Sequence, residues 1–131
     1  MITQGDIREL QLAKAAIYTG CAILMQHRAV SPEAIKRIYL AGAFGNYLDA
    51  MNAKIIGLIP DVPTENVVFV GNSALSGARM ALLSTAMRRE AADLSQRLTY
   101  VELGAASNFN EELIAATYLP HKDRHRFPSV H

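Results

Sequence analysis

Two apolar segments that each end in glycine and lead directly into a helix-forming stretch constrain the fold of this chain most. The first is KRIYLAG, residues 36–42, and the second is VVFVGN, residues 67–72. Runs of β-branched and aromatic residues bounded by Gly and Asn are typical of buried strands. Strands that alternate with helices indicate parallel pairing through right-handed crossovers. The sequence therefore predicts an α/β fold with a small, mainly parallel sheet flanked by helices.

The rest of the chain supplies helices and one further candidate strand. Thr3 followed by Asp6 predicts the start of a long helix that runs to about His27, because N-caps and first-turn acids mark helix starts. The other expected segments are a short helix over 49–56 with Asp49 as N-cap, a helix over 73–87 that residues 88–97 continue or follow as a separate helix, a third strand over 98–103, and a last helix over about 108–118 capped by Ser107. We expect residues 1–120 to form one domain and residues 121–131 to be a flexible tail with solvated histidines.

Composition and charge exclude several classes of protein and site. Half of the residues are hydrophobic, and 131 residues are enough for one folded core. A net charge of +1 argues against a nucleic-acid or acidic-membrane binder. The single cysteine rules out an intramolecular disulfide and a cysteine-based zinc or iron–sulfur site within the chain, and we expect no metal site. Without a membrane-length apolar run or a signal-peptide pattern, we expect a cytoplasmic protein.

The glycine-rich ends of the two predicted strands are the strongest candidate site. In open α/β sheets, ligands bind at the carboxyl ends of the strands. A glycine lets the backbone approach a phosphate or sugar closely, and the N-terminus of the following helix attracts anions. Tight turns alone would also explain these glycines, so both interpretations stay open. The candidate residues are Gly42, Ala43, Phe44, Gly45 and Asn46 after the first strand, and Gly71, Asn72 and Ser73 after the second.

A lysine in an apolar position of the first helix is the other candidate feature. Lys14 falls on an arc formed by Leu10, Ile17, Tyr18 and Cys21. A lysine in such a place must extend to solvent, pair with another group or meet a ligand, and these three possibilities stay open. Gln11 lies beside it. We interpret Cys21 as a small buried hydrophobe rather than a nucleophile.

Four segments, taken in order, carry a specific family resemblance. They are ITQGDIRELQLAKAAI, IYLAGAFGNYLDAMNAKIIGLIP, VVFVGNSALSGARMALLS and YVELGAASNFNEELIAATYLP. The run resembles the C-terminal ASKHA (actin/Hsp70/sugar-kinase-like) region of the reductive activators of corrinoid proteins, from residue 2 to about residue 128. In that superfamily a glycine-rich turn holds the phosphates and adenosine, and an upstream helix offers polar side chains to the ribose and base.

The resemblance implies part of an ATPase. Family members use ATP with Mg²⁺ to drive electron transfer from an iron–sulfur cluster in a ferredoxin-like domain to cob(II)alamin of a corrinoid protein, which restores the cob(I)alamin needed for methyl transfer. By the resemblance, the residues that line the adenosine and phosphates are Gly42, Ala43, Phe44 and Gly45, those that reach the ribose or base are Gln11 and Lys14, and those that form the neighbouring wall are Gly71, Asn72 and Ser73. Ala15 stands where Hsp70-like relatives have a base-stacking arginine, so that contact is not expected.

The resemblance further implies that the chain is the C-terminal part of a longer protein, with the cluster, the first ASKHA lobe and the Mg²⁺-binding acids elsewhere. Phosphoryl transfer needs groups from both walls of the site, so we expect this segment alone to bind ATP weakly and to hydrolyse none. An unpaired sheet edge also predicts a homodimer. Two other functions stay open: an interaction or dimerisation module that docks the corrinoid protein without a nucleotide role, and a small Rossmann-like enzyme domain. We expect no nucleic-acid or membrane partner.

Overall fold

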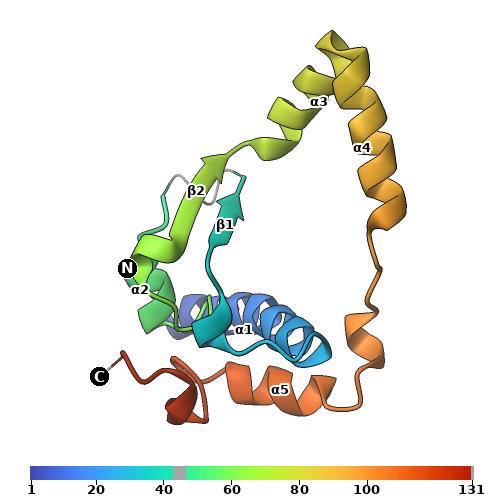
Figure 1. The fold of residues 1–131 in the computed structure, drawn as a ribbon. Coiled ribbons are helices and arrows are strands. Elements are labelled where there is room, and N and C mark those ends of the chain that lie inside the picture. Colours follow the sequence, from blue (N-terminus) through green and yellow to red (C-terminus); the bar gives the residue numbers. More distant parts are fainter. Residues whose placement is uncertain (43–46, 131) are drawn as a thin grey trace.

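A computed structural model describes residues 1–42 and 47–130. The helices are α1 (Gln4–His27), α2 (Ala50–Ile55), α3 (Ser73–Leu83), α4 (Thr85–Arg97) and α5 (Phe109–Ala116), and the strands are β1 (Ile38–Ala41) and β2 (Val67–Gly71). Short 3₁₀ turns occupy Pro32–Ala34, Thr64–Asn66, Leu103–Ala105 and Arg124–Arg126. α1 and α5 pack together, the strands rise from α1, and α3 and α4 form a bent arm between the end of β2 and α5 (Figure 1).

The helices α1 and α2 begin at the predicted residues because local caps satisfy their first N–H groups. The Thr3 hydroxyl accepts a hydrogen bond from the Asp6 N–H at 3.2 Å, and the Thr3 N–H donates to the Asp6 carboxylate at 2.8 Å. This reciprocal pair is a capping box. The Asp49 carboxylate accepts from the Asn52 N–H at 2.8 Å at the start of α2. Both predicted N-caps are confirmed.

The strands β1 and β2 form a two-stranded parallel sheet, as the sequence predicts. The register runs from Ile38 opposite Val67 to Ala41 opposite Gly71, with a shift just before Ala41. The connection between the strands contains α2, which serves as the crossover that parallel strands require. Both carboxyl ends therefore lie at the same edge of the sheet, next to the start of α3 (Figure 1).

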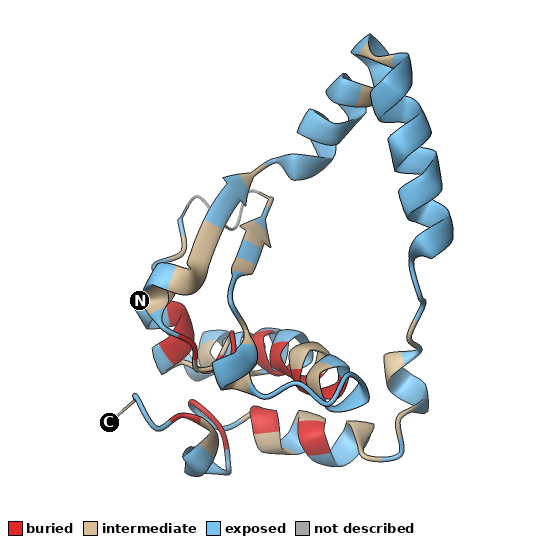
Figure 2. Ribbon diagram, viewed as in Figure 1, coloured by how far each residue is buried: buried red, intermediate tan, exposed pale blue. Residues whose placement is uncertain are grey.

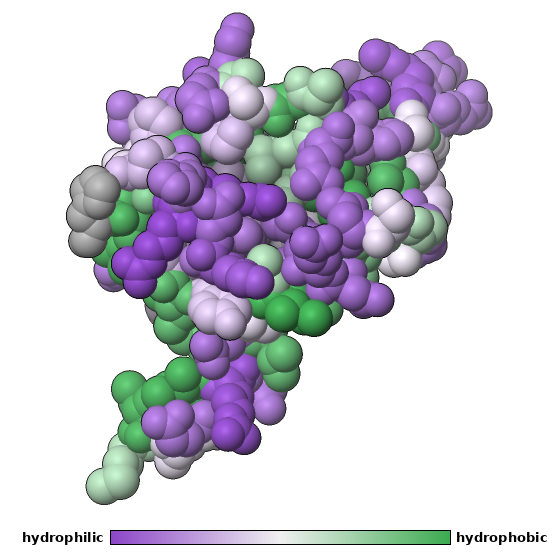
Figure 3. Space-filling model, turned by 90° about the horizontal axis from the view of Figure 1, so that it is seen from below, coloured by the Kyte–Doolittle hydropathy of each residue, from purple (hydrophilic) through white to green (hydrophobic). Residues whose placement is uncertain are grey.

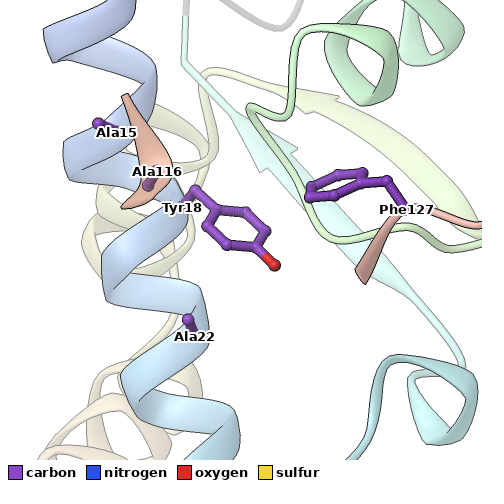
Figure 4. Close-up of a cluster of buried hydrophobic side chains, with 5 residues drawn as sticks. All are labelled: Ala15, Tyr18, Ala22, Ala116 and Phe127. Atoms are coloured by element: carbon purple, nitrogen blue, oxygen red, sulfur yellow. The ribbon is translucent and has the colours of Figure 1, made fainter. Parts of the chain in front are cut away.

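The core lies between α1, α5 and the chain after α5, residues 117–130, which we call the C-terminal segment. Buried residues occur on these elements and on α2, whereas α3 and α4 contain none (Figure 2). The main cluster consists of Ala15, Tyr18 and Ala22 of α1, Ala116 of α5, and Phe127. The rings of Tyr18 and Phe127 face each other across this cluster, with centroids 5.3 Å apart (Figure 4). Small residues on the helices thus leave room for two aromatic rings.

The loop after α2 packs directly against the C-terminal segment. Gly57 has a φ of +74°, and a Cβ at this position would lie 2.1 Å from the carbonyl oxygen of Pro120. Lys54 Nζ lies 3.4 Å from Asp61 Oδ1, and the Asp61 carboxylate also accepts from the Ser129 N–H at 2.8 Å. This loop and the end of the chain are therefore held together by close backbone contact and by a shared carboxylate.

The third strand predicted over residues 98–103 is wrong. The backbone at Leu98 and Glu102 is extended, but no strand forms here, and Leu103–Ala105 is a 3₁₀ turn. This segment runs from α4 to α5, away from β1 and β2 (Figure 1). A strand needs a neighbour with which to exchange backbone hydrogen bonds, and the described residues place none beside it. The side chains of this segment favour a strand, but strand propensity alone does not place a second strand beside it.

The C-terminal segment differs from the predicted flexible tail. His121 and Phe127 are 2% and 1% exposed, and the Lys122 N–H donates to the Ala115 carbonyl oxygen at 2.9 Å. His121 was predicted to be solvated, and this is wrong because its ring packs against Tyr18 at a centroid distance of 5.3 Å. His125 is exposed, as predicted. Residues 121–130 therefore belong to the packed body, and His131 lies outside the described residues.

Residues 73–97 form two helices because Ser84 interrupts them. Ser84 has extended backbone, and its hydroxyl accepts from the Met87 N–H at 3.3 Å, which makes it the N-cap of α4. Arg88 Nε donates to the Ala81 carbonyl oxygen at 3.1 Å near the end of α3. The corner between the two helices is thus fixed by one cap and one arginine.

The start of α5 lies one residue later than predicted. Its N-cap is Asn108 rather than Ser107, and the Asn108 side chain makes no cap hydrogen bond. It donates instead to the Gln26 side-chain oxygen of α1 at 2.8 Å. A contact between helices therefore replaces a local cap.

The surface seen from below the view of Figure 1 is mainly hydrophilic, with smaller hydrophobic patches between the polar side chains (Figure 3). Large apolar side chains are also exposed on the arm, where Leu82 and Leu83 are 76% and 73% exposed. None of the described helices is long and apolar enough to cross a membrane.

Candidate functional site

The two predicted glycine turns meet at one edge of the sheet. The Gly42 N–H donates to the Gly71 carbonyl oxygen at 2.7 Å. Both glycines have positive φ, +89° and +62°, a conformation that side chains disfavour. A Cβ on either glycine would meet nothing within 4 Å among the described residues. The strand ends are therefore adjacent, and no described side chain fills the space in front of them.

The N-terminus of α3 adds anion-binding capacity to this edge. Asn72 is the N-cap, and its side-chain oxygen accepts from the Leu75 N–H at 3.0 Å. The first N–H groups of a helix have no acceptor within it, and the helix dipole favours negative charge there. Ser73, the first residue of α3, lies two residues after Gly71. Open glycine backbone beside a capped helix N-terminus fits a phosphate-bearing ligand.

Four of the predicted site residues lie outside the described residues: Ala43, Phe44, Gly45 and Asn46. They connect Gly42 to Tyr47 along the chain. Their predicted contacts with adenosine and phosphates stay predictions.

Lys14 and Gln11 lie away from the strand ends and hold the C-terminal segment instead. Lys14 Nζ donates to the Tyr118 carbonyl oxygen at 2.5 Å and to the Pro120 carbonyl oxygen at 2.6 Å, and its side chain is fully buried. Gln11 Nε2 donates to the Thr117 carbonyl oxygen at 3.0 Å. α1 crosses the amino-terminal side of the strands, whereas their carboxyl ends point toward α3 (Figure 1). A ribose would have to displace the chain after α5 to reach this ammonium group.

The burial of Lys14 makes stability depend on pH. Desolvation lowers the pKa of its ammonium group from 10.5 to about 8. Between these values the unfolded chain binds more protons than the folded one, so the free energy of unfolding should rise as the pH rises. We expect the free energy of unfolding of the wild type minus that of Lys14→Met, measured by urea unfolding, to rise from about pH 8 to about pH 10.5. Identical pH dependence in both proteins would contradict this account.

Sequence reasoning missed a buried polar cluster under the C-terminal segment. Glu112 Oε1 lies 2.6 Å from Arg126 Nη1 and 3.4 Å from His121 Nε2. The His121 Nδ1 accepts from the Asp123 N–H at 3.0 Å, so the proton of the neutral ring sits on Nε2, facing Glu112. Burial, with the positive charge of Arg126 as a second cause, lowers the pKa of His121. The only signal in the sequence is an acidic pair, 111–112, followed by a charged segment over 122–126 that is mainly basic but includes Asp123.

The remaining candidates offer little chemistry. Burial raises the pKa of the Cys21 thiol, which keeps it protonated and supports its interpretation as a small hydrophobe. Within residues 1–42 and 47–130, no three His, Cys, Asp or Glu side chains are placed to hold a metal ion. Of the predicted site residues that the structure describes, those that lie together are Gly42, Gly71, Asn72 and Ser73 at the glycine edge.

Comparison with known protein families identifies the family of this chain. A sequence model described as the C-terminal domain of RACo, the ASKHA domain, matches residues 1–131. The chain belongs to this ASKHA domain family. The family assignment agrees with the resemblance seen in the sequence and with the mixed α/β architecture.

Relatives of this ASKHA domain are proteins of corrinoid activation. The chain is 40% identical over 117 residues to the corrinoid activation enzyme RamQ of Eubacterium limosum, covering 89% of this chain and 20% of RamQ. It is 27% identical over 111 residues to a [Co(II) methylated amine-specific corrinoid protein] reductase of Methanosarcina barkeri, covering 83% and 20%. A solved reductive activator for corrinoid, iron-sulfur protein superposes with a TM-score of 0.92 at 43% identity, over 98% of this chain and 20% of that protein. The ASKHA domain chain thus spans about a fifth of the length of these relatives.

Proposed function

We propose that this chain is the nucleotide-binding part of an ATP-dependent reductive activator of corrinoid proteins. In the complete activity, ATP hydrolysis drives an electron from an iron–sulfur cluster to cob(II)alamin of a partner corrinoid protein. The cluster belongs to another part of the activator, because one cysteine cannot hold it. The names of the relatives support the activator role. The paired, open glycines at the start of α3 support the nucleotide role.

Each residue of the glycine edge has a physical task in this proposal. Gly42 and Gly71 leave the backbone uncovered, so phosphate oxygens can approach peptide N–H groups without meeting a side chain. Asn72 fixes the start of α3, and the N–H groups from Ser73 onward supply partial positive charge. Bound Mg²⁺ would neutralise phosphate charge. We assign Lys14 and Gln11 to the support of the C-terminal segment rather than to the ribose.

A matched pair of glycine substitutions tests the nucleotide role. Gly42→Val places a side chain in the open space of the strand edge, and its φ of +89° adds backbone strain, so the unfolding of this variant is measured first; Gly77→Val places the same side chain in open space on α3. We expect Gly42→Val to weaken Mg²⁺–ATP binding by about tenfold or more, which corresponds to about 1.4 kcal/mol. Gly77→Val should leave the affinity within about twofold of the wild type. Calorimetric titration of folded protein provides the measurement.

The alternative function, an interaction module without a nucleotide role, predicts the opposite pattern. Both glycine variants would then bind ATP as the wild type does, or the wild type would not bind it at all. Binding of a corrinoid protein would respond instead to substitutions on the exposed arm, where Leu82 and Leu83 offer apolar surface. Tight binding of a nicotinamide dinucleotide would favour a Rossmann-like domain over both.

A further inference from the structure

His121 is a buried histidine whose ring is held in the packed body as a neutral base. The residue is 2% exposed, and its ring packs against those of Tyr18 and Phe127, with centroid distances of 5.3 Å and 6.5 Å. Its Nδ1 atom accepts a hydrogen bond from the Asp123 N–H at 3.0 Å. An imidazole nitrogen can accept a hydrogen bond only while it carries no proton. The packing of residues 121–130 therefore requires the neutral form of this ring.

The hydrogen bond to Nδ1 lies where the backbone of this segment turns. It joins the ring to the amide two residues later, directly before the 3₁₀ turn Arg124–Arg126. Phe127 follows this turn and enters the main cluster. A proton added to Nδ1 would make both ring nitrogens donors, so the Asp123 N–H would face another donor. Protonation of the ring thus acts on the backbone that positions Phe127.

The acidic neighbour of the ring offers a second proton little compensation. Glu112 Oε1 lies 3.4 Å from His121 Nε2 but only 2.6 Å from Arg126 Nη1. The buried Nε2 atom forms no hydrogen bond with the described residues, so the carboxylate is directed to the guanidinium group instead. Burial lowers the pKa of His121, the charge of Arg126 lowers it further, and Glu112 acts in the opposite direction. The balance favours the neutral ring.

The other charged and titratable groups around His121 come from α1 and from its own segment. α1 contributes Tyr18, whose pKa is raised by burial, and Lys14, whose ammonium group binds the carbonyl group directly before His121. The segment contributes Asp123, whose carboxylate lies 3.7 Å from Arg126 Nε. The charged residues that line the cavity beside the ring also include Glu111 and Lys122. Each of the two nearest carboxylates is thus already paired with Arg126.

We propose that His121 is a proton-operated latch: the neutral ring holds residues 121–130 against α1 and α5, and its protonation releases them. The added proton comes from solvent and binds Nδ1, and the Asp123 N–H then donates to water. The released ring reaches water, where its charge is hydrated. Release also uncovers the faces of Tyr18 and Phe127 that pack together in the closed state (Figure 4).

The pH range of the latch follows from the ordinary pKa of histidine, 6.5. Because the pKa in the packed state is lower, the released segment binds more protons than the packed one when the pH falls below 6.5. Stabilisation by the neutral ring is therefore complete above this pH and is lost as the pH falls toward the lowered pKa. Uptake of one proton raises the equilibrium constant for release by up to about tenfold between about pH 7.5 and about pH 5.5. Most carboxylates titrate below about pH 5, outside this range.

Amide hydrogen exchange of the 131-residue chain, followed by nuclear magnetic resonance, tests the proposal. The reporters are the Lys122 N–H, which donates to the Ala115 carbonyl oxygen, and the Asp123 N–H. We expect their protection factors, corrected for the intrinsic effect of pH on exchange, to fall several-fold, and at most about tenfold, from about pH 7.5 to about pH 5.5. Amides in the middle of α1 should keep their protection, because the latch opens the segment and not the helix.

Two substitutions of His121 remove the titrating proton in different ways. His121→Phe keeps a ring against Tyr18, and His121→Asn keeps an oxygen that can accept from the amide two residues later. Protection at Lys122 should then agree within about twofold at the two pH values, in both variants or in whichever of them folds. His125→Asn is the matched control, because it removes an exposed histidine of the same segment, and it should retain the response of the wild type.

The ring of the wild type supplies a readout that does not depend on any variant. Its nitrogen chemical shifts should show Nδ1 without a proton at about pH 7.5, and protonation should follow the same pH curve as the loss of protection. Protection that does not change with pH would overturn the proposal. So would a pH response that persists in the His121 variants, or an equal loss of protection in α1, which would mean that the whole body unfolds. None of these measurements requires nucleotide, so they stand apart from the ATP titration.

Discussion

Replacing Gly57 by alanine is expected to lower the free energy of unfolding by more than about 3 kcal/mol. The new Cβ would lie 2.1 Å from the Pro120 carbonyl oxygen and 2.8 Å from its carbonyl carbon. These are backbone atoms, so they can move away only if the loop after α2 separates from the C-terminal segment. The φ of +74° adds strain for any residue with a side chain. Steric conflict and backbone strain therefore act together.

Gly77→Ala is the matched control for this prediction. Gly77 lies inside α3, and a Cβ there would meet nothing within 4 Å. Alanine is the better helix former by about 1 kcal/mol, so this variant should be as stable as the wild type or more stable. Urea unfolding followed by circular dichroism measures both. A Gly57→Ala variant as stable as the wild type would mean that the loop and Pro120 do not touch.

Truncating Phe127 to alanine is expected to destabilise the protein by about 3–5 kcal/mol. Phe127 is 1% exposed and packs against Tyr18, so its removal leaves a cavity in the main cluster. Small domains have total stabilities of only about 5–15 kcal/mol, which makes this loss a large fraction of the whole. If residues 121–131 were a flexible tail, the same substitution would have no effect.

Tyr47→Ala supplies the control for the Phe127 variant, because Tyr47 is 92% exposed. We expect it to change the free energy of unfolding by less than about 0.5 kcal/mol. Thermal unfolding by calorimetry gives the comparison. Equal losses from both substitutions would place Phe127 outside the core.

Local signals made the regular elements predictable. The capping residues Thr3 and Asp49 set the starts of α1 and α2 through partners three residues away. The apolar runs of β1 and β2 identified both strands and their parallel pairing. The segment over 98–103 carried a similar propensity but has no strand beside it. Propensity shows what a segment can form, and only the tertiary structure shows whether a partner exists.

The part of the candidate site that is built from the backbone at the strand ends could be predicted from the sequence. The adjacency of Gly42 and Gly71 follows from parallel pairing of the strands that precede them. The position of Lys14 on an apolar arc left three possibilities, and its acceptors are 104 and 106 residues further along the chain. No local pattern could identify them. Glu112 and Arg126 were missed for a related reason. Each lies in a charged stretch of the sequence, charged stretches usually lie at the surface, and the two residues meet only in the tertiary structure.

The return of the chain end to its first helix has a consequence for biosynthesis. The core forms between α1 and Phe127, and about a hundred residues separate them along the chain. Residues emerge from the ribosome in order, and a domain closes only when its required contacts are available. The main cluster therefore cannot close until translation has passed Phe127. Chaperones that shield nascent apolar helices are the cellular machinery best placed to act during that interval.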